Sequence, residues 1–340
     1  MNLMNLDRRL IRQVATARVF FFVAVLAGFA AGIGAVFQAR QLSQIITRVF
    51  LNGLGLTEVL PALGILLAIV FGRAVVGFLS ETAAAAAALK IKENLRNLLV
   101  EHILALGPAY SQGERSGELL NTVSQGIEAL DAYFSQYLPQ VALAGTLPLA
   151  YFLVVLPVDP LSAGILLFTG PLIPLFMFLI GHNAEAFTRR QWNALGRMSA
   201  YFLDTLQGLA ALKALGRSMV QAERIAQVSE RYRQTTLSVL RVTFLSALAL
   251  ELLGTMGTAI IAVQIGLRLL YGQIGFELAF FILLLAPDFY LPLRALGLRF
   301  HASMSGVSAA RRIFVILEQP APHLHMDGYQ PAISLQAPFT

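Results

Sequence analysis

The chain has 340 residues, of which 57% are hydrophobic and 13% charged, and its formal net charge is +6. Soluble domains carry about 25% charged residues, and the mean hydropathy of +0.69 excludes a soluble globular domain. The basic residues stand in blocks between apolar runs, which is typical of membrane topology and not of nucleic-acid binding. The chain contains no cysteine, so disulfides, thiolate metal sites and cysteine nucleophiles are excluded.

Six apolar stretches are long enough to cross a membrane, which takes about 20 residues in a helix. The first one follows four arginines but is too long for the apolar core of a signal peptide, and five more stretches come after it. We therefore expect it to remain as a span. The sequence predicts an all-α membrane protein with six transmembrane helices near residues 19–46, 56–80, 135–156, 161–181, 242–265 and 276–293.

The Lys and Arg residues define an orientation. Most of them lie before the first span, in the loops 81–134 and 182–241, and from Arg294 onward. The three other loops, near 51–55, 157–160 and 267–275, contain only Arg268, with Arg48 at the edge of a span. Because basic loops stay in the cytoplasm, both termini and both long loops are expected there, beside the anionic lipid headgroups.

The two long loops carry a helical pattern. Apolar residues recur every three or four positions from Ile91 to Leu106, and charged residues fill the other face. No proline occurs from Asn183 to Arg241, so the fourth and fifth spans can also continue as helices. The sequence predicts short outer turns and long helical extensions on the cytoplasmic side.

Two motifs in these loops resemble those of type IV ABC exporters. The first runs from Pro108-Ala109-Tyr110 to Ser116-Gly117-Glu118-Leu119, and the second is Leu212-Lys213-Ala214-Leu215-Gly216-Arg217. Gly107-Pro108 is expected to break the helix, and a glycine lets the second segment fold back. The resemblance implies that these are coupling segments, which seat in ATP-binding domains; their expected residues are Pro108, Tyr110, Gly117, Glu118, Lys213, Gly216 and Arg217.

Longer segments resemble the CydD subunits of the heterodimeric CydDC exporter family. They include Glu128–Phe134, Thr169–Phe176, Thr188–Trp192 and Ala286–Arg294. This resemblance implies a homologous half-transporter subunit as partner, a bacterial inner-membrane location, and a link to cytochrome bd assembly. The family's substrates are glutathione and cysteine, and also haem.

The resemblance extends to about Glu318, so we expect a transmembrane domain over residues 1–318 and a linker over 319–340 that leads toward an ATP-binding domain. No Gly-x-x-x-x-Gly-Lys-Ser/Thr motif is present to cradle phosphates. We therefore expect no catalytic residue and no cofactor in this chain, with ATP and magnesium bound on the missing domain.

Polar residues inside the spans are the candidates for a solute path, because charge within a membrane is costly and commonly functional. A glutamine stripe lines one face of the first span, and two acids, Glu251 and Asp288, fall near the middle of their spans. Two interpretations remain open for the charged residues: structural pairing between helices, or a cavity that contacts an anionic or zwitterionic solute. The full set is Gln38, Gln41, Gln44, Arg48, Arg73, Glu251, Asp288 and Arg294.

The five histidines show no spacing typical of a metal helix, so no metal site is expected. His301 is a candidate haem contact, although a satisfied core or surface histidine is the simpler interpretation. Two other functions stay open: a secondary transporter or channel in which Glu251 and Asp288 relay protons, and a scaffold for oxidase assembly. Inner loops of this length favour an exporter, because they suit the seating of ATP-binding domains.

Overall fold

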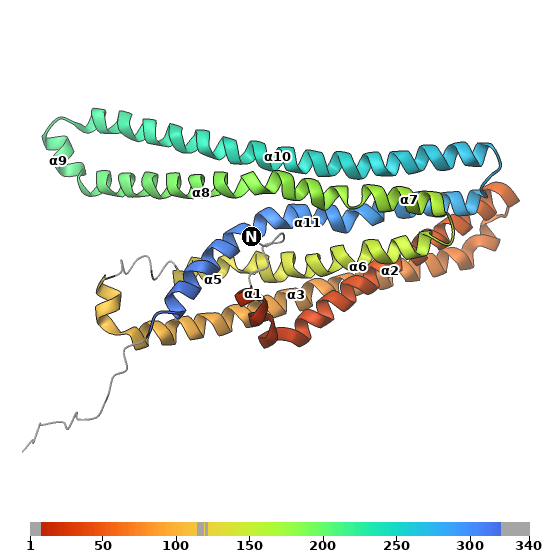
Figure 1. Ribbon diagram of the computed structural model, residues 1–340, viewed down its shortest axis with the longest axis horizontal. Coiled ribbons are helices and arrows are strands. Elements are labelled where there is room, and N and C mark those ends of the chain that lie inside the picture. Colours follow the sequence, from red (N-terminus) through yellow and green to blue (C-terminus); the bar gives the residue numbers. More distant parts are fainter. Residues whose placement is uncertain (1–7, 114–118, 120–121, 321–340) are drawn as a thin grey trace, which may run out of the picture.

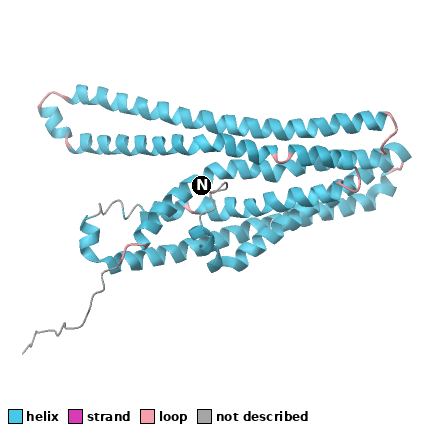
Figure 2. Cartoon of the chain, in the orientation of Figure 1, coloured by secondary structure: helices cyan, strands magenta, loops and turns pink. Residues whose placement is uncertain are grey.

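The computed structural model describes residues 8–113, 119 and 122–320, and every regular element in these ranges is helical (Figures 1 and 2). Six of the helical segments are long and apolar enough to cross a membrane, which confirms the all-α, six-span prediction. The elements are α1 (Arg8–Gln13), η1 (Val14–Ala17), α2 (Arg18–Asn52), α3 (Leu56–Gly113), η2 (Thr122–Gly126), α5 (Ile127–Ala129), η3 (Ala132–Tyr137), α6 (Leu138–Val155), α7 (Pro160–Thr169), α8 (Leu172–Gln207), α9 (Leu209–Ala214), α10 (Ser218–Leu270) and α11 (Phe276–Leu317).

The two ends of the molecule differ. The α2–α3, α6–α7 and α10–α11 connections all lie at one end, which we call the short-turn end (Figure 1). The opposite end, which we call the long-loop end, carries α9 and the far end of α3 (Figure 1). This arrangement agrees with the expected pairing of spans by short turns on one side and long helical extensions on the other.

The helical extensions are continuous with the spans. Up to its break at Gly107, α3 runs for 52 residues, about 78 Å at 1.5 Å per residue, whereas a hydrocarbon core is about 30 Å thick. With 53 residues, α10 is about as long. Close to the far end of α3, Gly107 adopts a left-handed φ of 81°, which breaks the helix at the position predicted from Gly107-Pro108.

Small residues set how closely the spans approach one another. A Cβ added at Gly32 on α2 would lie 2.2 Å from Leu147 on α6, and one at Gly257 on α10 would lie 2.3 Å from the hydroxyl of Tyr290 on α11. Large apolar side chains such as Phe71, Phe78 and Phe244 point outward and are about 70% exposed. The helices therefore contact each other through small residues and present large apolar ones to their surroundings, as in membrane bundles.

The fourth span differs from the continuous helix expected over 161–181. It consists of α7 and the first turns of α8, separated at Gly170-Pro171. Pro171 has no N–H to donate to the helix before it, and the ring of Phe289 on α11 packs where a side chain of Gly170 would lie, 3.0 Å from the Cβ position. The extended helices α8 and α10 then form a long hairpin that is closed by α9 (Figure 1).

Candidate functional site

A group of polar side chains lies between four spans. Arg73 on α3 donates a hydrogen bond from Nη1 to Oε1 of Gln38 on α2, at 2.8 Å. Arg73 also lies close enough to Asp288 on α11 to interact with it electrostatically, and Tyr151 on α6 interacts with both charges. We call Gln38, Arg73, Tyr151 and Asp288 the central cluster. It brings one cation, one carboxylate, one amide and one phenol together from distant parts of the chain.

The tyrosine of the central cluster is fixed by the packing around it. Its side chain is buried, and the Tyr151 hydroxyl donates a hydrogen bond to the carbonyl of Gly32, at 2.9 Å. Without a side chain, Gly32 admits both Leu147 and this contact. On the other side of the cluster, Pro292 has no N–H, so the Asp288 carbonyl lacks its usual helical partner. The cluster thus contains polar backbone as well as polar side chains.

A buried charge costs about 2.5–3.5 kcal/mol at the centre of a membrane on insertion scales. The hydrogen bond from Arg73 to Gln38 and the electrostatic attraction of Asp288 offset part of that cost, which fits the structural interpretation. The same groups can bind the carboxylate and ammonium of a zwitterionic solute, which fits the path interpretation. The geometry brings three of the predicted residues together, and their role in a solute path remains a prediction.

The rest of the glutamine stripe lies nearer the short-turn end of α2. Gln41 donates a long hydrogen bond from Nε2 to the carbonyl of Ala62 on α3, at 3.4 Å. Gln44 is half-buried and Arg48 is exposed. Sequence reasoning missed Ser43 beside them, which is fully buried and donates a hydrogen bond to the carbonyl of Glu277 on α11, at 2.5 Å. The stripe therefore contacts α3 directly, while Ser43 ties α2 to α11.

The other predicted acid is separate from the central cluster. Glu251 on α10 forms an ion pair with Arg294 on α11. A Cβ at Gly254, one turn further along α10, would lie 2.9 Å from Cδ of Arg294, so this glycine lets the arginine lie flat against α10. The side chains of Glu251 and Arg294 are 56% and 31% exposed, which leaves the pair open to lipid or to another chain.

A second polar group stands at the short-turn end and was not predicted. Asp159 caps the N-terminus of α7 by accepting hydrogen bonds from the backbone N–H and the hydroxyl of Ser162. The same carboxylate, whose side chain is 2% exposed, forms an ion pair with Arg268 on α10 at 2.7 Å. The sequence signal was an aspartate followed by proline at the first helical position. This ion pair accounts for the presence of Arg268, the one basic residue found within the short loops.

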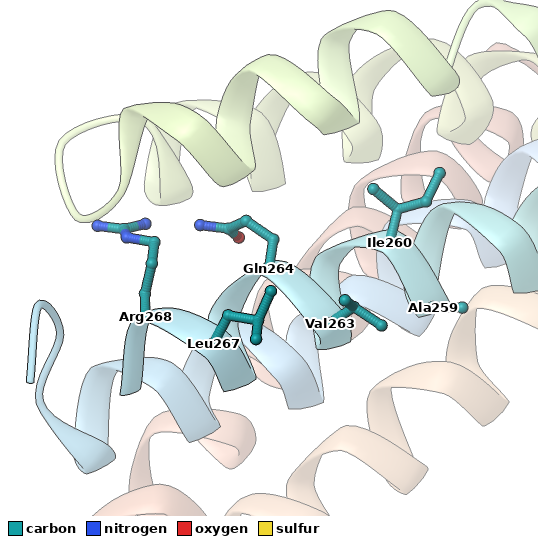
Figure 3. A pocket seen from close by; sticks show the side chains of 6 residues that line it. All are labelled: Ala259, Ile260, Val263, Gln264, Leu267 and Arg268. Atoms are coloured by element: carbon teal, nitrogen blue, oxygen red, sulfur yellow. The ribbon is translucent and has the colours of Figure 1, made fainter. Parts of the chain in front are cut away.

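Gln264 completes this group, since its side-chain amide lies 3.1 Å from the Ser162 hydroxyl, which donates its one proton to Asp159. Figure 3 shows the Gln264 and Arg268 side chains pointing from α10 toward the α6–α7 region. A mostly apolar groove of about 540 Å³ runs along the same helix beside Ala259, Ile260, Val263 and Leu267. Gln264 and Arg268 also line this groove, so the polar contacts stand at its edge nearest the α6–α7 turn.

Asp159 lies in the turn between α6 and α7, outside the membrane-spanning segments. Burial opposes its charge, but the hydrogen bonds from Ser162 and the Arg268 guanidinium outweigh this effect and hold the pKa of Asp159 below its ordinary value. The carboxylate is therefore charged at neutral pH, and the link between the α6–α7 turn and α10 is ionic.

Toward the long-loop end, an ion cluster joins α3 to the segment before α6. The buried Lys92 contacts Glu128 at 2.9 Å and Asp131 at 2.8 Å, and Arg96 contacts Glu128 at 2.8 Å. Sequence reasoning used Glu128–Phe134 only for a resemblance and missed this role. The available signal was the spacing of Lys92, three residues before Leu95 and seven before Leu99, which puts it on the buried side of α3, where a lysine needs acidic partners.

The expected coupling segments are partly described. Pro108 and Tyr110 lie in the last turns of α3, after the break at Gly107, while Gly117 and Glu118 lie outside the described residues. In the second segment, Lys213 lies in the last turn of α9, and Gly216 has a φ of 67° where the chain turns back into α10. Arg217 is exposed at the start of α10. The turn at Gly216 confirms the predicted fold-back.

The tip of the α8–α10 hairpin exposes apolar side chains. Leu215, Met219 and Val220 are 73%, 80% and 54% exposed, although the tip lies far from the spans (Figure 1). Adjacent Lys213 and Arg217 add positive charge. An apolar group with a charged rim is typical of a protein contact surface.

Among the described residues, no group of three His, Cys, Asp or Glu side chains could hold a metal ion. The backbone of His301 lies in α11, but its side chain is outside what the structure describes. His102 contacts the carbonyl of Gln319 through Nε2, at 2.9 Å.

Comparison with known proteins places the chain. The model of the family described as the ABC transporter transmembrane region matches residues 21–290. The chain belongs to this family. The chain is also 35% identical over 285 residues to the glutathione/L-cysteine transport system ATP-binding/permease protein CydC of Bacillus subtilis, which covers 84% of the chain and 50% of the relative.

Two further relatives are similarly close. The chain is 34% identical over 328 residues to the glutathione/L-cysteine transport system ATP-binding/permease protein CydD of Escherichia coli, covering 94% of the chain and 56% of that protein. It is 33% identical over 322 residues to the transport ATP-binding protein AarD of Providencia stuartii, covering 92% of the chain and 55% of that protein. These matches confirm the resemblance to the CydDC branch of the ABC transporter transmembrane family. The chain spans about half the length of the relatives it matches.

Proposed function

We propose that this ABC transmembrane domain moves glutathione or cysteine out of the bacterial cytoplasm. The central cluster carries the proposal, because it brings the Arg73 cation and the Asp288 carboxylate together between four spans. Glutathione and cysteine are zwitterions at neutral pH. Arg73 would bind a carboxylate and Asp288 an ammonium, while Gln38 and Tyr151 supply hydrogen bonds.

The proposal includes a complete transporter around this domain. ATP and magnesium bind to ATP-binding domains, a homologous half-transporter subunit forms the second half, and the assembly lies in the bacterial inner membrane with both termini in the cytoplasm. Two observations support this assembly: the exposed apolar tip at α9 offers a contact for an ATP-binding domain, and the concentration of basic residues at the long-loop end favours a cytoplasmic location for that end.

Uptake of labelled glutathione and cysteine into inverted membrane vesicles tests the function. The vesicles contain the subunit, its partner and ATP. We expect Asp288→Asn and Arg73→Gln each to lower uptake about tenfold or more, because a charge-assisted hydrogen bond contributes about 1.5–3 kcal/mol. Glu58→Gln is the matched control, since Glu58 is an exposed acid at the start of α3 that bonds to the backbone of Gly55.

Three results would contradict the proposal. Uptake that does not require ATP would favour the secondary-transporter alternative. Full uptake by both cluster variants would remove the central cluster from the path. The absence of glutathione and cysteine uptake in active vesicles that transport another solute would reject the substrate class.

Haem and a link to cytochrome bd assembly remain part of the proposal through the family resemblance. The test is a haem titration of the purified subunit followed by its absorbance, with His301→Ala as variant and His102→Ala as control. A shifted haem absorbance that is lost only in His301→Ala supports haem as a substrate. Equal spectra in all three proteins reject His301 as its contact.

A further inference from the structure

A cavity of about 400 Å³ lies between α8 and α10, outside the expected membrane spans. Its described lining residues are Ala194, Arg197, Tyr201, Asp204, Val228 and Arg231. On α8 they recur at three- and four-residue spacings, so they share one face of that helix. The cavity is therefore a gap between two neighbouring helices of the hairpin, and it is separate from the central cluster.

Direct contacts between α8 and α10 occur on both sides of the cavity. Toward the membrane, Gln191 donates a hydrogen bond to Thr236 at 3.2 Å. Toward α9, Gln221 donates one to the buried Thr205 at 3.0 Å. The two helices are thus held together at both ends of a polar gap, which keeps the cavity walls at a fixed spacing.

The polar groups that line the cavity lack hydrogen-bond and ion-pair partners within the described part of the chain, and the charged ones stand exposed at its open side. The Tyr201 hydroxyl is buried without a hydrogen-bond partner there, although buried hydroxyls are normally paired. No ion pair among the described residues involves Arg197 or Arg231. The nearest acid on α10, Glu230, instead accepts hydrogen bonds from Arg233 and Gln234.

We propose that this cavity binds a small solute through a carboxylate or phosphate group. The oxyanion lies between the Arg197 and Arg231 guanidiniums, which are suited to such groups, and accepts a hydrogen bond from the Tyr201 hydroxyl. The volume is within the range of small-molecule sites. Asp204 lies seven residues from Arg197, about 10 Å along the helix, so the cavity also offers a carboxylate to a solute with a cationic group at its other end.

A bound solute would join α8 to α10 just before α9, which begins at Leu209. The site therefore stiffens the hairpin next to its tip when the solute is present. This binding does not depend on which solute crosses the membrane, and it uses none of the residues of the central cluster.

Isothermal titration calorimetry of the purified subunit with its partner tests the site. The probes are inorganic phosphate, succinate and glutathione, which separate phosphate, carboxylate and zwitterion chemistry. We expect Arg197→Gln and Arg231→Gln each to weaken binding of the preferred probe about tenfold or more, and Tyr201→Phe to weaken it about three- to tenfold. Arg224 is an exposed arginine on α10 outside the cavity, so the Arg224→Gln variant should bind the probe as tightly as the unmodified protein does.

Asp204→Asn distinguishes the two ends of the cavity. It should weaken glutathione binding and strengthen succinate binding, because it removes a carboxylate that attracts an ammonium and repels an anion. Failure of all three probes to bind overturns the proposal. So does an equal loss in Arg224→Gln, which would indicate a diffuse charge effect. Asp288→Asn should leave calorimetric binding unchanged, so failure of this site and failure of the transport path are separate outcomes.

Discussion

Arg73 on α3 donates a hydrogen bond to Gln38 on α2, although 35 residues and a tight turn separate them. Together with the hydrogen bonds from Gln41 to Ala62 and from Ser80 to Ala24, this contact fixes which turns of α2 and α3 face each other.

The ion pair between Glu251 and Arg294 should contribute to stability as a unit. Glu251→Gln and Arg294→Gln each leave one charge unpaired within a span. The sum of the two single losses of thermal stability in detergent should therefore exceed the loss of the double variant. We expect a coupling energy of about 1 kcal/mol or more from the double-mutant cycle. Additive losses would show that the two side chains stabilise the fold independently.

The Asp159 contact predicts a pH dependence. A carboxyl whose folded pKa lies below its unfolded value stabilises the fold above the unfolded pKa, and this contribution disappears as pH falls through the folded pKa. For Asp159, the stability difference from Asp159→Asn should be full near pH 7 and should shrink below about pH 4. Thermal unfolding at several pH values measures it. Ser162→Ala keeps the Arg268 ion pair and should retain part of the dependence, whereas a constant difference at all pH values would contradict the assignment.

The close contact of Gly257 with Tyr290 predicts a steric effect. Gly257→Ala puts a methyl group 2.3 Å from the Tyr290 hydroxyl, which must then move away from its partner Thr169. We expect a loss of about 1–3 kcal/mol, measured by thermal unfolding. Gly266→Ala on the same helix is the control, because nothing lies within 4 Å of its added carbon. The prediction is wrong if both alanines behave alike.

Orientation in the membrane can be tested with single cysteines, because the chain has none of its own. Asn52→Cys and Gln273→Cys lie exposed at the short-turn end and should react with an impermeant thiol reagent in intact cells. Ser218→Cys is also exposed but lies at the long-loop end, so it should react only after the cells are permeabilised. Labelling of Ser218→Cys from outside would reverse the orientation.

The tip of the hairpin should couple transport to ATP hydrolysis. Leu215→Ser and Met219→Ser remove apolar surface that is exposed in this chain, so the domain should still fold and insert. In the assembled transporter we expect transport to fall severalfold while ATP hydrolysis continues. Leu237→Ser is the control, since this exposed leucine lies further along α10. Normal transport by both tip variants would contradict the coupling role.

The sequence was sufficient for the number of spans and their pairing, because these depend on local hydrophobicity and on loop charge. Gly107 and Gly216 were also predictable as turns, since a left-handed φ favours glycine. The break at Gly170-Pro171 was missed, because an apolar run that contains proline can still continue as one helix when neighbouring elements satisfy the backbone.

The polar sites were harder to predict, because each depends on how the helices pack. Gln38, Arg73 and Asp288 were recognised as costly inside a membrane, but hydrophobicity did not indicate that Glu251 would pair with Arg294 and stand apart from them. Tyr151 and Asp159 were missed because neither is unusual in its local sequence. Their roles arise from contacts with Gly32 and Arg268, which lie 119 and 109 residues away.

The interruption at Gly170-Pro171 is a point at which α8 could change its direction relative to α7. Its 36 residues correspond to about 54 Å, so a rotation of about 10° at the interruption would displace the far end by about 9 Å. The pivot lies beside Phe289, the immediate neighbour of Asp288. A small rearrangement around that carboxylate would therefore cause a large displacement of α9. Conversely, a large displacement of α9 would cause only a small one around the carboxylate.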